Sequence, residues 1–110
     1  MVIFVEMPLF TELITGLVDD AAYAEFQKEL LQNPKKGNVI PHSGGLRKIR
    51  MRLPGRGKSG GARVIYAIVL RATALALLDV YTKSDQADLT PQERKLIAKL
   101  IRAIESGFEA

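Results

Sequence analysis

Cationic side chains are concentrated in one stretch of the sequence, between Arg47 and Arg63. This stretch contains seven Lys and Arg residues, four glycines and no Asp or Glu. Lys48, Arg50 and Arg52 alternate with apolar residues, as in a strand that buries one face and exposes the other. Arg outnumbers Lys, and the planar guanidinium can bind phosphate through two hydrogen bonds. The pattern therefore indicates a surface that binds an anion such as nucleic acid.

If this surface cleaves RNA, the residue types favour chemistry carried by cations. Metal-dependent cleavage needs carboxylates, and the basic stretch has none; Asp79, Asp85 and Asp88 follow it without forming a metal motif. His42, the only histidine, stands in a loop rich in Pro and Gly. A lysine crowded by positive charges has a lowered pKa and could take a proton from a 2′-hydroxyl, while arginines hold the charge on the phosphate. The sequence permits this scheme, with no metal and no cofactor, but does not require it.

The simplest alternative is an exposed strand face whose charges only keep the sheet edge soluble. The sequence disfavours it because the bases continue through a glycine-rich loop, at Arg56 and Lys58, and return at Arg63. If the strands on either side of the loop pair as a hairpin, these side chains converge on one face. The sequence therefore predicts an anion-binding surface flanked by a loop that carries cations.

For Tyr66, Tyr81 and Lys83, a structural role must likewise be compared with a functional one. Tyr66 lies within an apolar strand and is expected in the core. Tyr81 ends a later strand and Lys83 follows two residues on, so Tyr81 could stack on a base while Lys83 touches phosphate. Packing at the end of the strand explains Tyr81 equally well. Tyr81 and Lys83 are both candidate catalytic residues.

The expected elements that position these residues are three strands and three helices. A short first strand at Val2 to Val5 precedes them. Apolar side chains at helical spacing predict helices from Leu9 to Val18 and from the Asp19–Asp20 pair to Leu31, and the segment 34–45 reads as a loop. Strands are expected at 48–53, 62–70 and 75–81, connected as an antiparallel meander. Thr90, Pro91 and Glu93 form a capping box at the start of a last helix. The order β, α, α, β, β, β, α predicts an α+β fold with the helices on one face of a small antiparallel sheet.

Length and composition bound the remaining possibilities. The 110 residues suit a single domain spanning 1–110, and 47% apolar with 25% charged residues is typical of a folded protein. The absence of cysteine excludes disulfides and fits a reducing cytoplasm. The N-terminal residues do not read as a signal peptide, and no apolar run is long enough for a bilayer, so no membrane partner is expected. Positions 30–78 hold ten bases and no acid, whereas positions 1–29 hold six acids and one base.

The segments GGLRKIRMRLPGRGKSGGARVIYAIV (44–69) and LLDVYTKSDQADLTPQERKLIAKLI (77–101) resemble the HigB branch of the RelE-like toxins of type II toxin–antitoxin systems. The similarity covers nearly the whole chain in element order and residues 33–104 in motif detail. It implies a compact fold like that of microbial ribonucleases. It also implies ribosome-dependent endonucleolytic cleavage of mRNA, which inhibits translation, and control by a cognate antitoxin.

The resemblance also suggests roles for single residues and partners. Lys48 and Arg50 match the cationic residues at the scissile phosphate, Arg63 matches the arginine that stabilises the transition state, and Lys83 matches a basic residue after the last core strand. The resemblance also implies that the other bases of the stretch contact RNA or the ribosome, namely Arg47, Arg52, Arg56 and Lys58. The expected antitoxin is a helix-turn-helix protein of the HigA type, through which DNA would be contacted only indirectly. One departure is Leu89, which stands where some relatives have a tyrosine, so Tyr81 is at most a substitute.

Two other functions are compatible with the sequence. A toxin of the related ParE type would poison a topoisomerase without cleaving RNA, although a cationic sheet does not favour it. A plain RNA- or ribosome-binding module would bind with a steep salt dependence and would not arrest growth.

Overall fold

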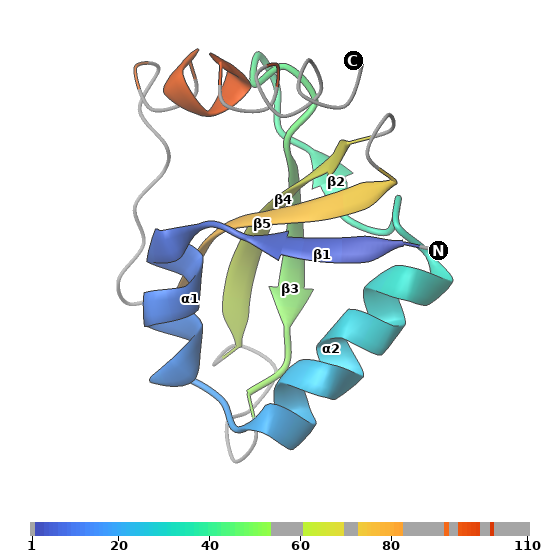
Figure 1. The fold of residues 1–110 in the computed structure, drawn as a ribbon, viewed down its shortest axis with the longest axis vertical. Coiled ribbons are helices and arrows are strands. Elements are labelled where there is room, and N and C mark those ends of the chain that lie inside the picture. Colours follow the sequence, from blue (N-terminus) through green and yellow to red (C-terminus); the bar gives the residue numbers. More distant parts are fainter. Residues whose placement is uncertain are drawn as a thin grey trace.

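The computed structural model describes residues 2–53, 61–69 and 73–82, together with Gln92, residues 95–99 and Arg102. Its elements, in chain order, are β1 (Ile3–Glu6), α1 (Pro8–Thr15), α2 (Asp20–Gln32), β2 (Asn38–Val39), β3 (Arg47–Met51), β4 (Ala62–Val69) and β5 (Ala74–Thr82). Residues 95–99 are helical as well. The α+β class is confirmed (Figure 1). In the part of the chain described, no helix has the length and apolar character needed to cross a membrane.

A five-stranded sheet in the order β1-β5-β4-β3-β2 forms the centre of the molecule. The meander β3-β4-β5 is antiparallel throughout, as the strand pattern predicts. Two features differ from expectation. β1 joins β5 in parallel, and the segment expected to be a loop contributes β2, which pairs with the start of β3. The short connections of the meander fix its own direction, whereas two helices and three strands lie between β1 and β5 in the chain and leave the direction of that pair open.

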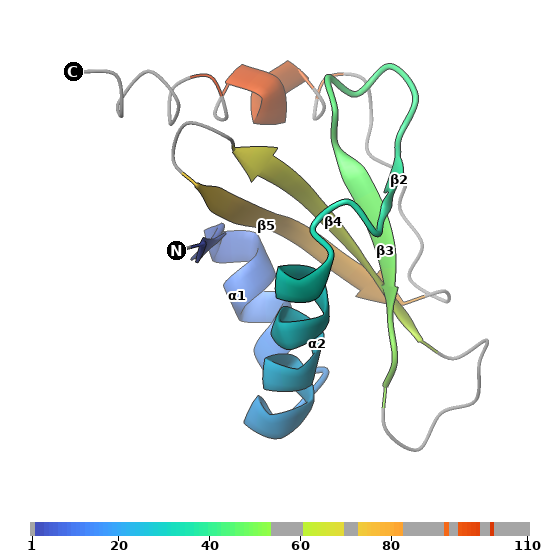
Figure 2. The same cartoon turned by 90° about the vertical axis from the view of Figure 1, so that its right-hand side faces the viewer.

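The two N-terminal helices cover one face of the sheet (Figure 2). Phe10 and Ile14 of α1 and Phe26 and Leu30 of α2 are buried there against residues of β3, β4 and β5. Burial of each such side chain stabilises the fold by about 2 kcal/mol. Asp19 caps α2 by accepting a 2.8 Å hydrogen bond from the Ala22 amide, which confirms the predicted break between the helices.

The apolar stripe of α1 is wider than the part that the sheet covers. Leu9 and Leu13 belong to the predicted stripe but are 52% and 38% exposed. The helix lies so that Phe10 and Ile14 point to the core, which leaves the neighbouring leucines at the rim.

A second apolar cluster lies on the opposite face of the sheet. Leu46, Ile65, Val69 and Leu78 belong to it, and Ile97 from the C-terminal helical residues packs against it. In Figure 2 these helical residues, drawn in orange-red, lie beside the end of the sheet where β3 begins and β4 ends. The expectation that all helices share one face is therefore wrong for the last one. β4 and β5 are apolar on both faces, so each face requires a cover.

A carboxylate joins β1 to both N-terminal helices. Glu6 accepts hydrogen bonds from the Thr11 hydroxyl at 2.7 Å and from the Tyr23 hydroxyl at 2.6 Å. Burial, and then the neighbouring Glu6 carboxylate, hold the pKa of Tyr23 well above its ordinary value. The phenol therefore stays protonated and keeps donating to Glu6, which fixes the two helices against the edge of the sheet.

Candidate nucleic-acid interface

The strand register brings the cations of the basic stretch together. Arg50 lies directly opposite Arg63, and Arg63 lies directly opposite Tyr81. In the next row, Lys48 lies opposite Ile65. Directly opposite residues of paired strands share a face, so these side chains lie on the face of the sheet away from α1 and α2. The convergence expected for a hairpin is thus present, and we call Lys48, Arg50 and Arg63 the cationic face.

The cationic face is accessible to a ligand. Lys48 and Arg50 are exposed, and Arg63 is half-buried. The Nη1 atom of Arg63 donates a 3.2 Å hydrogen bond to the Gly61 carbonyl, which turns the guanidinium back along its own strand. Because Arg50 and Arg63 lie directly opposite each other, an anion placed between them would be attracted by both charges. This geometry suits a phosphate.

Close backbone approach at Gly61 draws the end of β3 to the start of β4. A Cβ atom at this position would lie 2.8 Å from the Met51 carbonyl oxygen and 3.5 Å from Cγ of Arg50. The first distance is too short for any side chain to be accommodated without a shift of the backbone. Glycine here therefore sets how closely Arg50 and Arg63 can approach.

Tyr81 stands in the same row but is largely enclosed. Its side chain is 9% exposed and belongs to the second apolar cluster. Little of the ring is left for a nucleotide base to stack on, which favours packing at the strand end over stacking. A role of Tyr81 in catalysis stays a prediction.

Arg47, expected to bind RNA, lies on the other face. It lies opposite Tyr66, and its guanidinium donates to the carbonyl oxygens of Gly37 at 2.7 Å and Lys35 at 3.1 Å. The Tyr66 hydroxyl donates to the Pro34 carbonyl at 2.7 Å and accepts from the Gly37 amide at 2.9 Å. Arg47 and Tyr66 thus hold the segment before β2 in place, and Tyr66 is in the core as predicted.

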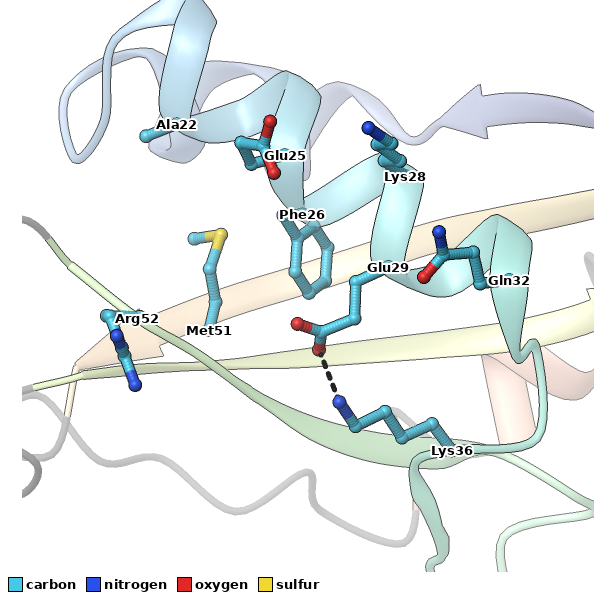
Figure 3. A pocket seen from close by; sticks show the side chains of 9 residues that line it. All are labelled: Ala22, Glu25, Phe26, Lys28, Glu29, Gln32, Lys36, Met51 and Arg52. Carbon is cyan, nitrogen blue, oxygen red and sulfur yellow. Dashed lines mark ion pairs between the residues drawn. The ribbon is translucent and has the colours of Figure 1, made fainter.

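Arg52 is separated from the cationic face as well. β3 ends at Met51, and Arg52 lines a groove of about 850 Å³ between α2 and the end of β3 (Figure 3). A 3.2 Å ion pair between Lys36 and Glu29 lies along this groove. Acidic and basic groups both line it, namely Glu25, Lys28, Glu29, Lys36 and Arg52. Such a mixed surface does not select for an anionic ligand.

Three predicted residues lie outside the described part of the chain: Arg56, Lys58 and Lys83. Their expected contacts with RNA or ribosome, and the catalytic role of Lys83, stay predictions. Among the residues described, no three His, Cys, Asp or Glu side chains are grouped as a metal site.

One charged residue of this face was not expected from the sequence. Asp79 lies opposite Ile65, in the row of Lys48, because the register shifts between Ile65 and Tyr66. An acid inside a buried, β-prone run was the available signal, since such a residue must reach the surface or a charged partner. The bulge that turns it toward the cations leaves no mark in the alternation of residue types.

Comparison with protein families identifies the chain. The sequence profile described as the RelE toxin of the RelE/RelB toxin–antitoxin system matches residues 23–107. The protein belongs to the RelE toxin family. It is therefore a toxin of a toxin–antitoxin system, and its family implies a cognate antitoxin. Toxins of this family are generally endoribonucleases.

Proposed function

We propose that this toxin is a metal-independent endoribonuclease that cleaves mRNA on the ribosome, in the cytoplasm, through its cationic face. The observation that carries the proposal is the direct pairing of Arg50 with Arg63, beside Lys48, on an exposed part of the sheet. Two arginines at cross-strand distance form a site for one phosphodiester, which can accept hydrogen bonds from both.

The chemistry that these residues support is an internal transfer. Lys48, the lysine of the cationic face, takes the proton of the 2′-hydroxyl as this oxygen forms a bond to phosphorus. Arg50 and Arg63 stabilise the extra negative charge of the pentavalent transition state. The bond from phosphorus to the 5′-oxygen then breaks, and that oxygen takes a proton from a neighbouring acid or water. The products are a 2′,3′-cyclic phosphate and a 5′-hydroxyl.

Dependence on the ribosome follows from what the cationic face lacks. Arg50 and Arg63 hold a phosphate, but the described residues offer little exposed aromatic surface to orient a base, since Tyr81 is enclosed. The ribosome would then orient the message on the cationic face, and correct orientation of the reacting groups supplies much of the rate of such a reaction. We assign the chain to the HigB-like branch and its antitoxin to the helix-turn-helix HigA type, on the motifs in residues 33–104.

The proposal is tested by Arg63→Ala in cells that express the toxin without antitoxin. Loss of one contact to the transition state lowers the rate by roughly 10²- to 10³-fold, so growth arrest should be relieved. Growth curves and the abundance of full-length messages after induction provide the measurement.

Arg102→Ala is the matched control, because it removes the same charge from an exposed helical residue outside the cationic face. This variant should arrest growth as the parent does. Persistent arrest by a folded Arg63→Ala protein that still binds antitoxin would contradict the role given to Arg63.

A further inference from the structure

The short strand β2 brings an uncharged polar side chain next to the cationic face. Asn38 lies directly opposite Lys48 in the pair of β2 and β3, so the two side chains share a face of the sheet, with Cβ atoms about 5 Å apart. Arg50 follows two residues after Lys48 and is the diagonal neighbour of Asn38, at about 7 Å. Val39, the other residue of β2, lies opposite Arg47 and therefore on the opposite face.

The Asn38 side chain is exposed and chemically different from its neighbours. Within the described part of the chain, its amide group makes no hydrogen bond. The amide has two N–H donors and an oxygen with two acceptor sites, so it can bind a ligand group that both donates and accepts. Because it carries no charge, it adds nothing to the general attraction that Lys48 and Arg50 exert on phosphate.

The residue before Asn38 is fixed through both of its backbone groups. The Gly37 amide donates a 2.9 Å hydrogen bond to the Tyr66 hydroxyl, and the Gly37 carbonyl accepts a 2.7 Å bond from the Arg47 guanidinium. β2 is only two residues long, so its own pairing with β3 contributes little stability. The bonds at Gly37 tie it to the core instead. Asn38 therefore presents its amide from a fixed backbone, as selective recognition requires.

The surroundings of Lys48 show where a nucleotide beside it can lie. Its two cross-strand neighbours are Ile65 of β4 and Asn38 of β2. Ile65 is 2% exposed and belongs to the second apolar cluster, whereas Asn38 is exposed. A nucleotide that follows a phosphate bound by Arg50 and Arg63 therefore finds an exposed polar surface in this row over β2 and not over β4.

We propose that Asn38 recognises the edge of an RNA base beside the phosphate bound by Arg50 and Arg63, and so is a residue that determines the sequence preference of the toxin. The inference rests on the proposed function in taking the cationic face as the RNA-binding surface. Phosphate is identical in every nucleotide, so Lys48 and the two arginines cannot distinguish sequences. The exposed edge of an unstacked base differs from one base to another in its donors and acceptors, and an Asn amide can pair with one of each.

The test uses the purified toxin and three short single-stranded RNAs, made of adenine, cytosine or uracil nucleotides alone, with every 2′-hydroxyl methylated. These probes cannot be cleaved by attack of the 2′-oxygen, so fluorescence anisotropy measures binding apart from catalysis. Asn38→Ala should bind the probe that the parent prefers about fivefold more weakly, and the least favoured probe within about twofold of the parent. The salt dependence should stay the same, because no charge is removed.

Two further variants separate base recognition from other effects. Val39→Ala is the matched control, since it shortens the neighbouring side chain of the same strand on the opposite face. Its order of preference among the probes should equal that of the parent. Lys48→Ala removes a cation, so it should weaken binding of every probe by a similar factor and lower the slope of log affinity against log salt by about one. Thermal unfolding of each variant reports folding independently.

The outcomes distinguish failure of this inference from failure of the proposed function. An equal loss for all probes in Asn38→Ala, no loss in a folded Asn38→Ala, or the same change of preference in Val39→Ala would overturn the role of Asn38 and leave the cationic face in place. Unchanged binding by Lys48→Ala, or a parent that binds none of the probes, would remove the RNA-binding surface on which both proposals rest.

Discussion

Arg47 and Lys48 are adjacent in the sequence but serve opposite faces of the sheet. Lys48 is exposed on the cationic face, whereas the Arg47 guanidinium is bonded to two carbonyl oxygens beneath it. Alternation along β3 separates Lys48 and Arg50 from their neighbours, and the sequence is sufficient to predict that much. The sequence cannot predict the hydrogen bonds of the Arg47 guanidinium, because its partners are the backbone carbonyls of Lys35 and Gly37, which residue types do not reveal.

Asp79 shows the same limit in another form. Its distance from the basic stretch in the sequence hides its place on the cationic face, and only the bulge after Leu77 brings it there. The position of Tyr81 at the end of a strand makes it a candidate from the sequence, but its burial depends on how the second apolar cluster packs around it. Residue types thus identify candidates, while register and burial decide which of them face the ligand.

At the residue scale, Tyr66→Phe should destabilise the protein by about 1–3 kcal/mol at pH 8. The change leaves the Pro34 carbonyl and the Gly37 amide without their partner at a fully buried position. Urea unfolding followed by circular dichroism measures the loss. A free energy of unfolding equal to that of the parent would contradict the bonding role of this hydroxyl.

The same variant should also differ from the parent in how its stability depends on pH. Burial, above all, raises the pKa of Tyr66, while the Gly37 amide bond and the charge of Arg47 act the other way. Because the folded pKa exceeds the unfolded value of about 10, the stabilisation is complete below about pH 10 and is lost as pH rises through the folded pKa. The parent should therefore lose more stability than Tyr66→Phe between about pH 9 and pH 11, on either side of the unfolded pKa of tyrosine.

At the scale of elements, the meander could be read from the sequence and its surroundings could not. β3, β4 and β5 begin and end within two residues of the expected strands, because short connections and a period of two leave few alternatives. The parallel direction of β1, the pairing of β2 and the face chosen by residues 95–99 depend on contacts between segments far apart in the chain. Sequence periodicity contains no information on those contacts.

Gly61→Ala tests whether the β3-β4 pairing sets the geometry of the cationic face. The added methyl would meet the Met51 carbonyl oxygen, so the strand ends must move apart and carry Arg50 and Arg63 with them. We expect a loss of stability of about 1–3 kcal/mol and a clear reduction of growth arrest in cells.

Gly16→Ala is the control, since a methyl there would lie 3.7 Å from its nearest neighbour, the Leu13 carbonyl oxygen. This variant should fold and arrest growth as the parent does. Full toxicity of Gly61→Ala with unchanged stability would show that the close approach at the hairpin does not position the arginines.

At the scale of the whole molecule, the sheet separates charges of opposite sign. The acid-rich residues 1–29 form β1, α1 and most of α2, and the two helices cover one face; the cationic face is on the other. An approaching polyanion is therefore attracted to one side and repelled from the other, which orients it before contact. This layout, the register of Arg50 and Arg63, and membership of the RelE family together support mRNA as the substrate.

The chemical ends of the cleaved message test this account most directly. Attack by the 2′-oxygen, assisted by Lys48 and stabilised by Arg50 and Arg63, leaves a 2′,3′-cyclic phosphate and a 5′-hydroxyl, whereas attack by a metal-activated water leaves a phosphate on one fragment and an ordinary hydroxyl on the other. Total RNA taken minutes after induction can be ligated with and without prior 5′-phosphorylation and then sequenced. The account predicts new 5′-hydroxyl ends within translated messages, absent when Arg63→Ala is induced. New 5′-phosphate ends that depend on the toxin, or intact messages accompanied by signs of DNA damage, would contradict it.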